Sequence, residues 1–447
     1  MRQKLLIITL IISTIVIISG CQKEVRTNDI NTSEQIQKKP FDLQNVEASA
    51  LQYRALVEKS LKQTEIKLQA VKQTIEKLKS ERSQMHGNSD LMTTPKKAVI
   101  HVPADYPTLQ EAVDGAAQNS KILVTGSISD LGDVLIDVPD LTILGDDNSA
   151  TINGNMLMIT AANITIKNLN INMAVVISGT SNAKFISNNI SAPNSTGAIG
   201  PFLSMNSNSD TIRNCHADGI YQGGSYEYGF YLDGLSNNNE IIGCIAENTS
   251  NTESSSAFRI DGANNLIKNC SASNFTRGFS SFGGYSKNNQ FIGCVANNSN
   301  NDAGFVFFLP DESNLILKNC TANNNITDGF FIDGGFCNVS NCTANANGSL
   351  GILVILNDFI VEKNAFKNNG YAGIYIYGDN TYGLVSGTIQ KNTVESNAAF
   401  GIYLKGVINS AMTKNASTSN PACDFNQTNC SGNTLTGNTF GTSCTGL

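Results

Sequence analysis

The chain has 447 residues, of which only 15% are charged, and a formal net charge of −7 at pH 7. This balance argues against a nucleic-acid partner, because phosphate binding needs a basic protein face. Neutral polymers and proteins remain as candidate partners.

Residues 1–20 are typical of a secretory signal peptide, with two early cations before an apolar run from Leu5 to Ile18. The run is short for a membrane-spanning helix. The tetrapeptide that ends at Cys21 resembles the lipobox of bacterial lipoproteins, which implies cleavage before Cys21 and a lipid on its sulfur. An aspartate directly after the lipidated cysteine would resemble a signal for retention in the inner membrane, but this chain has Gln22 there. We therefore expect an outer-membrane lipoprotein that faces the periplasm or the cell surface. An uncleaved membrane anchor is the alternative.

Residues 21–45 are polar and lack periodicity, which predicts a flexible tether. Residues 46–86 contain no Gly or Pro, which predicts one long helix. Nine residues of this helix follow one another at steps of four and three, which is the spacing of a coiled-coil seam. They are Val57, Leu61, Thr64, Leu68, Val71, Ile75, Leu78, Arg82 and Met85. A coiled-coil stalk that joins several copies of the chain is the favoured interpretation. A single helix that packs along the rest of its own chain is the alternative.

Residues 97–116 predict a short strand, a turn with two prolines and a helix. Thr108 begins the helix and Glu111 follows three residues later, which is the spacing of a capping box. We expect this helix to cover the open first turn of whatever follows, because exposed strand edges and apolar interiors need protection. Two apolar strands that end in glycine come next, at Lys121–Gly126 and Leu141–Gly145.

Two short phrases alternate between Thr211 and Asn415. The first has Cys at its centre, as in Lys268–Ala272, and later repeats without Cys, as in Lys363–Ala365. The second is an alternating apolar strand, as in Gly229–Gly234. A period of roughly 20–30 residues built from short strands and turns is typical of a solenoid.

The Pro-Thr-x-x-Glu-Ala helix, the glycine-ended strands and the repeated phrases resemble the pectin-lyase-like superfamily of right-handed parallel β-helices. The resemblance covers roughly 97–445 and implies an all-β fold over residues 97–447, with an N-terminal capping helix and the long helix before it. The superfamily includes lyases, hydrolases, esterases, epimerases and non-enzymatic surface proteins, so it specifies the fold and not the activity. The sequence lacks the catalytic motifs of its pectate lyases, polygalacturonases and mannuronan epimerases.

Six cysteines hold the same place in successive repeats and should stack about 4.8 Å apart. They are Cys215, Cys244, Cys270, Cys294, Cys320 and Cys342. A row of buried free thiols is the favoured interpretation, and disulfides between adjacent coils are the alternative. Cys337 falls outside the row, and one disulfide among Cys423, Cys430 and Cys444 could staple the last turn. We predict no metal or other cofactor, because no cysteine and histidine spacing of the zinc type occurs.

Alternation assigns the faces of the second phrase. The inward set is Phe230, Leu232, Phe258, Ile260, Phe305, Phe307, Phe330, Ile332, Ile352, Val354, Ile374, Ile376, Ile402 and Leu404. Asparagines of the first phrase should bond to the turn backbone and to their equivalents one coil away. This predicted ladder comprises Asn214, Asn269, Asn319, Asn341, Asn364, Asn392 and Asn415.

The outward positions of the second phrase are rich in aromatic side chains, on which sugar rings could stack. The candidate ligand-binding residues are Tyr231, Phe282, Phe308, Phe331, Tyr375, Tyr377 and Tyr403. The alternative, which we rank slightly higher, is that the long helix or a second subunit covers this strip.

Asp233 and Asp261 should lie on neighbouring coils with Arg259 beside them, an arrangement suited to acid/base attack on a glycosidic bond or beside a uronic carboxylate. Both aspartates precede glycine at strand ends, which is also ordinary turn chemistry. His216 is a weaker candidate base. We therefore expect a binding or interaction scaffold for polysaccharide or protein, with a polysaccharide lyase, hydrolase or epimerase as the alternative.

Overall fold

The computed structural model describes residues 45–87, 97–130, 132–192, 200–218, 228–248, 256–355, 358–378 and 385–445. All of them belong to one compact unit, Pro40–Leu447. The predicted signal peptide, Cys21 and nearly all of the predicted tether lie outside the described residues. Within the described ranges, no helix combines the length and the apolar character needed to cross a membrane.

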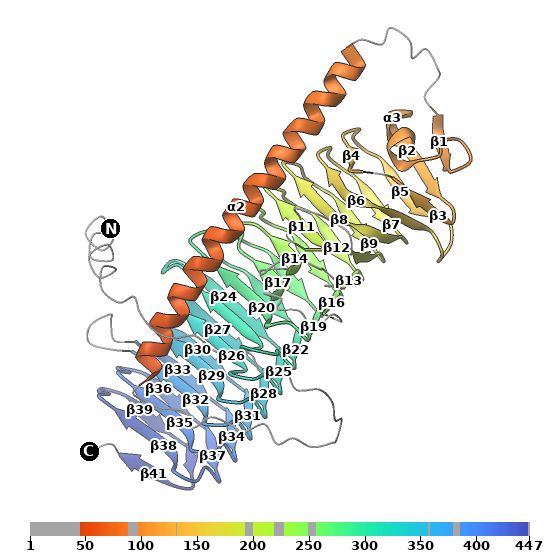
Figure 1. Ribbon diagram of the computed structural model, residues 1–447. Helices are drawn as coiled ribbons and strands as arrows, with labels where there is room; N and C mark the ends of the chain where they lie inside the picture. Colours follow the sequence, from red (N-terminus) through yellow and green to blue (C-terminus); the bar gives the residue numbers. More distant parts are fainter. Residues whose placement is uncertain are drawn as a thin grey trace, which may run out of the picture. The chain divides into compact units, whose positions relative to one another are not determined.

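The predicted solenoid is confirmed, with about 13 turns of parallel strands (Figure 1). One face of the solenoid is a fifteen-stranded parallel sheet, here called the first sheet. Its strands, in order, are β1 (Lys97–Val102), β2 (Ala116–Val124), β5 (Thr142–Gly145), β7 (Thr165–Lys167), β9 (Lys184–Ile186), β12 (Thr211–Arg213), β15 (Glu240–Ile242), β18 (Leu266–Lys268), β21 (Gln290–Ile292), β24 (Asn314–Lys318), β27 (Phe336–Ser340), β30 (Phe359–Glu362), β33 (Gly387–Gln390), β36 (Ala411–Thr413) and β39 (Thr434–Thr436).

Two further rows of parallel strands complete each coil. The short row is β3 (Ser127–Ser129), β10 (Asn189–Ser191), β13 (His216–Asp218), β16 (Ile245–Glu247), β19 (Ser271–Ser273), β22 (Val295–Asn297), β25 (Thr321–Asn323), β28 (Thr343–Asn345), β31 (Ala365–Lys367), β34 (Thr393–Glu395), β37 (Ala416–Thr418) and β40 (Thr439–Phe440). The long row is β4 (Val134–Ile136), β11 (Phe202–Met205), β14 (Tyr228–Leu232), β17 (Ser256–Ile260), β20 (Arg277–Phe282), β23 (Phe305–Phe308), β26 (Phe330–Asp333), β29 (Leu350–Ile355), β32 (Ala372–Tyr377), β35 (Phe400–Lys405), β38 (Cys423–Thr428) and β41 (Ser443–Thr445). Strands β6 (Thr151–Ile159) and β8 (Asn170–Ser178) pair with both rows and join them.

The core consists of like side chains stacked from coil to coil. Phe230 and Phe258 stack with ring centroids 5.0 Å apart, and Phe279 and Phe305 continue the stack at 4.8 Å each. These distances equal the strand spacing, because the parallel register places equivalent residues directly over one another. All fourteen predicted inward residues are fully buried in this core, which confirms the predicted faces.

The turn between the first sheet and the short row corrects the predicted asparagine ladder. Asn341 takes the left-handed conformation with φ of 54°, and Lys363, not Asn364, takes it in the next coil, with φ of 56°. Asn364 instead occupies the cysteine position, where its side-chain oxygen accepts the Cys342 N–H at 2.7 Å. The predicted ladder therefore mixes two turn positions. Up to Asn341 its members take the left-handed position, and from Asn364 onward they stand one residue later, at the cysteine position.

Cysteine and asparagine perform the same task at this inward turn position. The Cys320 N–H donates to Cys342 Sγ at 3.4 Å, and the Asn364 N–H donates to Asn392 Oδ1 at 2.9 Å. In both cases the side chain accepts the backbone N–H of the preceding coil, so the ladder satisfies a buried donor. All six predicted row cysteines are free and buried, as is Cys337.

A second asparagine ladder, which sequence analysis missed, lies at the turn between the short row and the long row. Asn325, Asn347, Asn369 and Asn397 each accept hydrogen bonds from the coil before, with side-chain contacts of 2.9 to 3.0 Å along the row. Each of these side chains is buried. Both ladders therefore fix the coil geometry and are structural.

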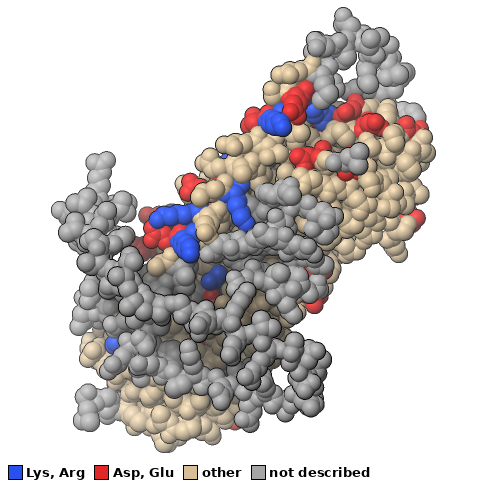
Figure 2. Space-filling model, in the orientation of Figure 1, with Lys and Arg blue, Asp and Glu red and all other residues tan. Residues whose placement is uncertain are grey.

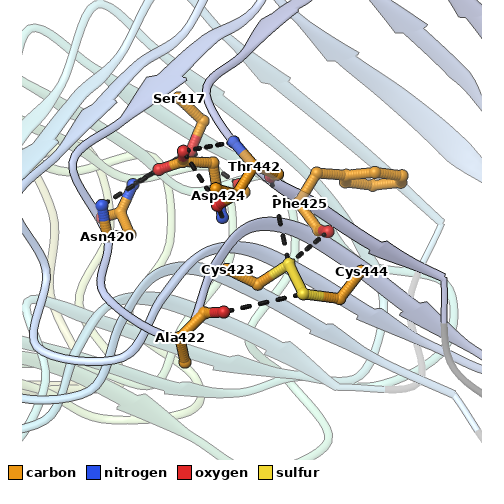
Figure 3. The surroundings of a disulfide bond; sticks show 8 residues. All are labelled: Ser417, Asn420, Ala422, Cys423, Asp424, Phe425, Thr442 and Cys444. Carbon is orange, nitrogen blue, oxygen red and sulfur yellow. Dashed lines mark hydrogen bonds between the residues drawn. A yellow bond between two sulfur atoms is a disulfide. The ribbon is translucent and has the colours of Figure 1, made fainter.

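The two ends of the solenoid are closed in different ways. At the start, α3 (Leu109–Asp114) buries its apolar face, and Thr108 Oγ1 accepts the Glu111 N–H at 3.2 Å, as the capping pattern predicts. At the other end, a disulfide joins Cys423 and Cys444 beside the hydrogen bonds of Asp424 (Figure 3). Cys430 remains free.

Candidate functional site

The long helix α2 (Asn45–Gly87) packs along the solenoid through the seam that the sequence predicts (Figure 1). Val71 and Ile75 are 1% and 2% exposed and lie in one apolar cluster with Met158 and Met205 of β6 and β11. Leu68 and Leu78 pack against the same cluster. The structure thus shows the second of the two predicted arrangements, in which the seam packs against its own chain.

The opposite face of α2 carries its charges. Lys62 and Lys77 are both more than 70% exposed and pair along the helix with Glu58 and Glu81. Figure 2 shows acidic and basic side chains gathered along α2, while most of the described solenoid surface in that view is uncharged. Exposed pairs of this kind contribute little, so the apolar seam supplies most of the docking energy.

A polar clamp fixes the end of α2 near the capping helix. The buried Arg82 guanidinium donates from Nη1 to the Leu135 carbonyl at 2.7 Å. Its Nη2 pairs with Asp114 of α3 and lies 3.3 Å from Asp137. The seam prediction placed Arg82 at an apolar position, and the structure shows that its charge is satisfied there by two carboxylates and one carbonyl.

Arg259 is the centre of a buried polar cluster between α2 and the long row. Its Nε donates to Asp261 Oδ2 at 2.7 Å, and its Nη1 donates to Thr64 Oγ1 of α2 at 3.1 Å and to the Tyr228 hydroxyl. The Thr64 and Tyr228 hydroxyl oxygens are 3.0 Å apart. Arg259 therefore ties a helix and a strand together in the same way that Arg82 does at the other end.

Aromatic rings surround this guanidinium. Its central carbon lies 5.0 Å from the ring centres of Tyr228 and Tyr231 and 5.2 Å from that of Phe282. The Tyr231 hydroxyl donates to Asp261 Oδ2 at 3.2 Å. Cation–π contacts of this kind gain strength where water is absent, and Arg259 is 0% exposed.

Burial and charge act against each other in the pKa values of the cluster. Burial raises the pKa of Asp261, although Arg259 and the Phe282 N–H, which donates to Oδ1 at 2.8 Å, oppose that shift. Burial disfavours the charge on Arg259, but Asp261 and the phenol oxygens outweigh it and raise the pKa of the guanidinium. Burial also disfavours ionised Tyr228, and the Arg259 charge nevertheless lowers its pKa. The arrangement is a buried ion pair in which Nε and Nη1 of Arg259 are hydrogen-bonded, while its Nη2 has no hydrogen-bond partner among the described residues.

Asp233, the other predicted catalytic carboxylate, has a different role. Its Oδ1 accepts the Asn206 N–H at 3.0 Å, the Leu235 N–H at 3.1 Å and the Ser236 hydroxyl at 2.8 Å. The register of β14 and β17 places Asp233 and Asp261 on neighbouring coils, as predicted. Asp233 nevertheless holds a turn, which is the alternative that its Asp-Gly sequence indicated.

The predicted aromatic ligand strip is buried in this structure, apart from the half-buried Phe308. Tyr231, Phe282 and Tyr375 are at most 3% exposed, and Phe331, Tyr377 and Tyr403 at most 7%. Leu61 of α2 packs against the cluster that contains most of them. Tyr375 and Tyr403 stack face to face at 4.9 Å. The strip is therefore buried in this structure, and α2 contacts it through Leu61.

Several buried carboxylates were not identified from the sequence. Asp302 pairs with Arg277 at 2.7 Å, and burial raises its pKa well above the ordinary value. Burial also raises the pKa of Asp328 to about 7 and that of Asp210 to about 6. Each accepts backbone N–H groups at a turn, and the sequence signal, an Asp among Asn and Ser, does not distinguish them from exposed turn aspartates.

The remaining candidates do not assemble into a site. His216 begins β13 on the outside of the short row and is half-buried. Within the part of the chain that the structure describes, no three His, Cys, Asp or Glu side chains are placed to hold a metal ion.

Comparisons with known proteins give the family. No curated protein matches the chain. Among solved structures, the A-module of mannuronan C-5 epimerase AlgE4 from Azotobacter vinelandii is 14% identical with a TM-score of 0.48, covering 79% of this chain and 98% of that one. The catalytic domain of a GH87 alpha-1,3-glucanase is 12% identical with a TM-score of 0.44, covering 79% and 68%.

The family model described as "Right handed beta helix region" matches three overlapping segments of the chain, residues 203–360, 250–388 and 351–447. Together they span residues 203–447, which is more than half of the 447 residues. The chain therefore belongs to the right handed beta helix region family.

Proposed function

We propose that this chain is a bacterial cell-envelope lipoprotein, held at the outer membrane by a lipid on Cys21, whose solenoid is an interaction scaffold for a polysaccharide or a protein. One observation carries the scaffold proposal. The three side chains best suited to catalysis are 0% exposed (Arg259) and 4% exposed (Asp233 and Asp261), and each is engaged in bonds that hold a turn or the helix α2. A general acid or base must reach its substrate within hydrogen-bond distance, and these groups face the protein.

The regularity of the solenoid supports a binding role. Equivalent side chains repeat at each strand spacing of about 4.8 Å along the sheets, so the outer faces present rows of the same chemistry. A rigid row can bind an extended polymer at many points without losing conformational entropy of its own.

The alternative, a polysaccharide lyase, hydrolase or epimerase that uses Asp233, Asp261 and Arg259, requires α2 to leave the long row. Its departure would expose the apolar seam of Val71 and Ile75 to water and break the hydrogen bond from Arg259 to Thr64. Both costs weigh against the alternative.

The test separates binding from turnover. The full chain is incubated with a panel of uronate and neutral polysaccharides, and both retention of the polymer and formation of new ends, double bonds or epimers are measured. We expect binding without chemical change. Turnover that disappears in Asp261→Asn and persists in Asp311→Asn, which changes an exposed carboxylate, would establish the enzyme instead.

The lipid anchor is tested on Cys21. We expect metabolic labelling with a radioactive fatty acid to mark the chain and the label to be lost in Cys21→Ser. Membrane fractionation should place the labelled chain in the outer membrane. Labelling that survives the substitution would contradict the proposed anchor.

A further inference from the structure

The outward face of the first sheet carries a row in which cations and isoleucines alternate. The strand register links Lys167 to Ile186, then to Arg213 and Ile242, and onward to Lys268, Ile292 and Lys318. Each link joins residues that lie directly over one another on adjacent strands. The four cations are therefore separated by two strand spacings, or about 9.6 Å.

This row is accessible to solvent. Lys167, Arg213, Lys268 and Lys318 are exposed, and the three isoleucines between them are half-buried. Lys184, on the same face of β9, is also exposed. The outward positions of β7 to β24 thus carry five cations and one acid, Glu240, although the net charge of the whole chain is −7. The row is a local basic stripe on an acidic protein.

Glu240 forms a long ion pair with Arg213 and partly neutralises its charge. The two side chains are 3.9 Å apart and about half exposed, at 46% for Glu240 and 49% for Arg213. An exposed pair of this length contributes little, so an incoming anion can replace Glu240 at small cost.

From this row we propose that the first sheet binds a linear anionic polysaccharide that presents one carboxylate on the same side every second sugar. This inference rests on the scaffold proposal and specifies its ligand. An extended chain of pyranose rings advances by about one strand spacing per sugar, so its same-side charges coincide with the cations of alternate strands. The apolar faces of the intervening sugars then lie over Ile186, Ile242 and Ile292.

Charge spacing decides the specificity. At physiological salt the screening length is about 8 Å, which is shorter than the separation of the cations. Each cation therefore acts almost independently and contributes only when a polymer charge lies directly over it. A polymer of the wrong charge spacing meets one or two cations and binds weakly.

The experiment uses the full chain and three probes. Hyaluronate carries a carboxylate on alternate sugars, polymannuronate carries one on every sugar with alternating sides, and dextran is neutral. Affinity is measured by electrophoresis through gels that contain each polymer, at low and high salt. Both anionic polymers present a carboxylate on the same side every second sugar, so we expect both to retain the chain, less strongly at high salt, and dextran not to retain it.

Matched variants test the row itself. Replacing Lys167, Lys268 and Lys318 together by Gln should weaken binding roughly tenfold or more, since three exposed ion pairs are lost. The control replaces three exposed lysines on the outer face of α2, Lys62, Lys72 and Lys77, by Gln and makes the same change in net charge. Equal loss in both triple variants would overturn the proposal.

Two further variants separate spacing from charge. Lys268→Ile with Ile292→Lys keeps the composition and moves one cation out of the alternation, so it should weaken binding about twofold, which is the share of one independent cation in the tenfold loss of the triple variant. Glu240→Gln frees Arg213 and should increase affinity severalfold. If the chain binds an anionic polymer and neither change alters the affinity, the row is not the site and the scaffold proposal stands. If no polymer binds at all, this inference fails, while scaffolding of a protein remains to be tested by retention of a protein partner.

Discussion

Thr64 of α2 and Tyr228 of β14 share a hydrogen bond of 3.0 Å between their hydroxyl oxygens, across 164 residues of sequence. The buried Arg259 guanidinium donates to both hydroxyls. A helix that looks like an independent stalk in the sequence is therefore part of the solenoid's own polar interior.

Arg259→Met should destabilise the fold by about 3–5 kcal/mol, because it leaves the Asp261 carboxylate buried without its partner. The Thr64 and Tyr228 hydroxyls would also lose a donor. We expect a lower midpoint in urea and earlier proteolysis within α2. The double variant Arg259→Met with Asp261→Asn should recover much of the loss, since Asn retains an acceptor for the Phe282 N–H. Equal stability of wild type and Arg259→Met would mean that the pair contributes nothing.

Ile75→Ala and Ile66→Ala form a matched pair on the same helix. Ile75 is 2% exposed against the solenoid, and Ile66 is 69% exposed on the outer face. The first change should cost about 2–5 kcal/mol by leaving a cavity in the interface. The second should change stability little, because Ala is the better helix former. Hydrogen exchange in α2 should rise only in Ile75→Ala, and the chain should sediment as a monomer; a dimer or trimer broken by Ile66→Ala would indicate a stalk instead.

The free thiols should divide sharply by accessibility. Of the eight free cysteines in the described ranges, seven are buried and Cys430 is half-buried. In a Cys21→Ser background, a thiol reagent should label Cys430 slowly in the native chain, because burial raises its pKa. The other seven should react only after unfolding. Rapid native labelling of Cys270 or Cys294, mapped by mass spectrometry, would show that the row opens.

Asp328 should make stability depend on pH. Burial raises its pKa from 3.8 to about 7, so between those values the folded chain keeps a proton that the unfolded chain has lost. The contribution of this group to stability is therefore full below about pH 4 and falls as the pH rises toward 7, by roughly 1.4 kcal/mol per unit at most.

Asp328→Asn removes that dependence while keeping an acceptor for the Leu350 N–H at 2.9 Å. Relative to wild type, the variant should gain stability as the pH rises from about 4 to 7, measured by urea unfolding at several pH values. Asp311→Asn, at an exposed position, is the control and should leave the slope unchanged. An unaltered slope in Asp328→Asn would assign the pH dependence to other groups.

The repeated phrases allowed the strand faces to be predicted, because alternation has a period of two in any strand. They did not allow the ladder to be aligned after Cys342. In the sequence Asn364 matches Asn341, but in the fold it replaces Cys342, since Lys363 can adopt the left-handed turn conformation that Asn usually occupies. A phrase of three residues is too short to distinguish these registers.

The seam of α2 has the same ambiguity. Leu61, Val71 and Ile75 recur as in a coiled coil, and an apolar stripe of this spacing packs equally well on a partner helix or on a sheet. Asp233 and Asp261 were placed on neighbouring coils by the repeat alone. Their separate roles, one in a turn and one in an ion pair with Arg259, depend on which groups approach from other parts of the chain.

The sequence by itself determined a solenoid and its inward stacks of Phe and Ile, because both follow from periodicity repeated at every coil. The parallel β-helix was implied by the family resemblance, and the capping helix by the spacing of Thr108 and Glu111. Only the tertiary structure decided that the aromatic strip is buried, with Leu61 of α2 packed against it, and that the buried Arg259 donates to Thr64. It also aligned Lys167, Arg213, Lys268 and Lys318 on alternate strands. These relationships join residues that are far apart in the chain, and their energies depend on desolvation and register, which no local pattern specifies.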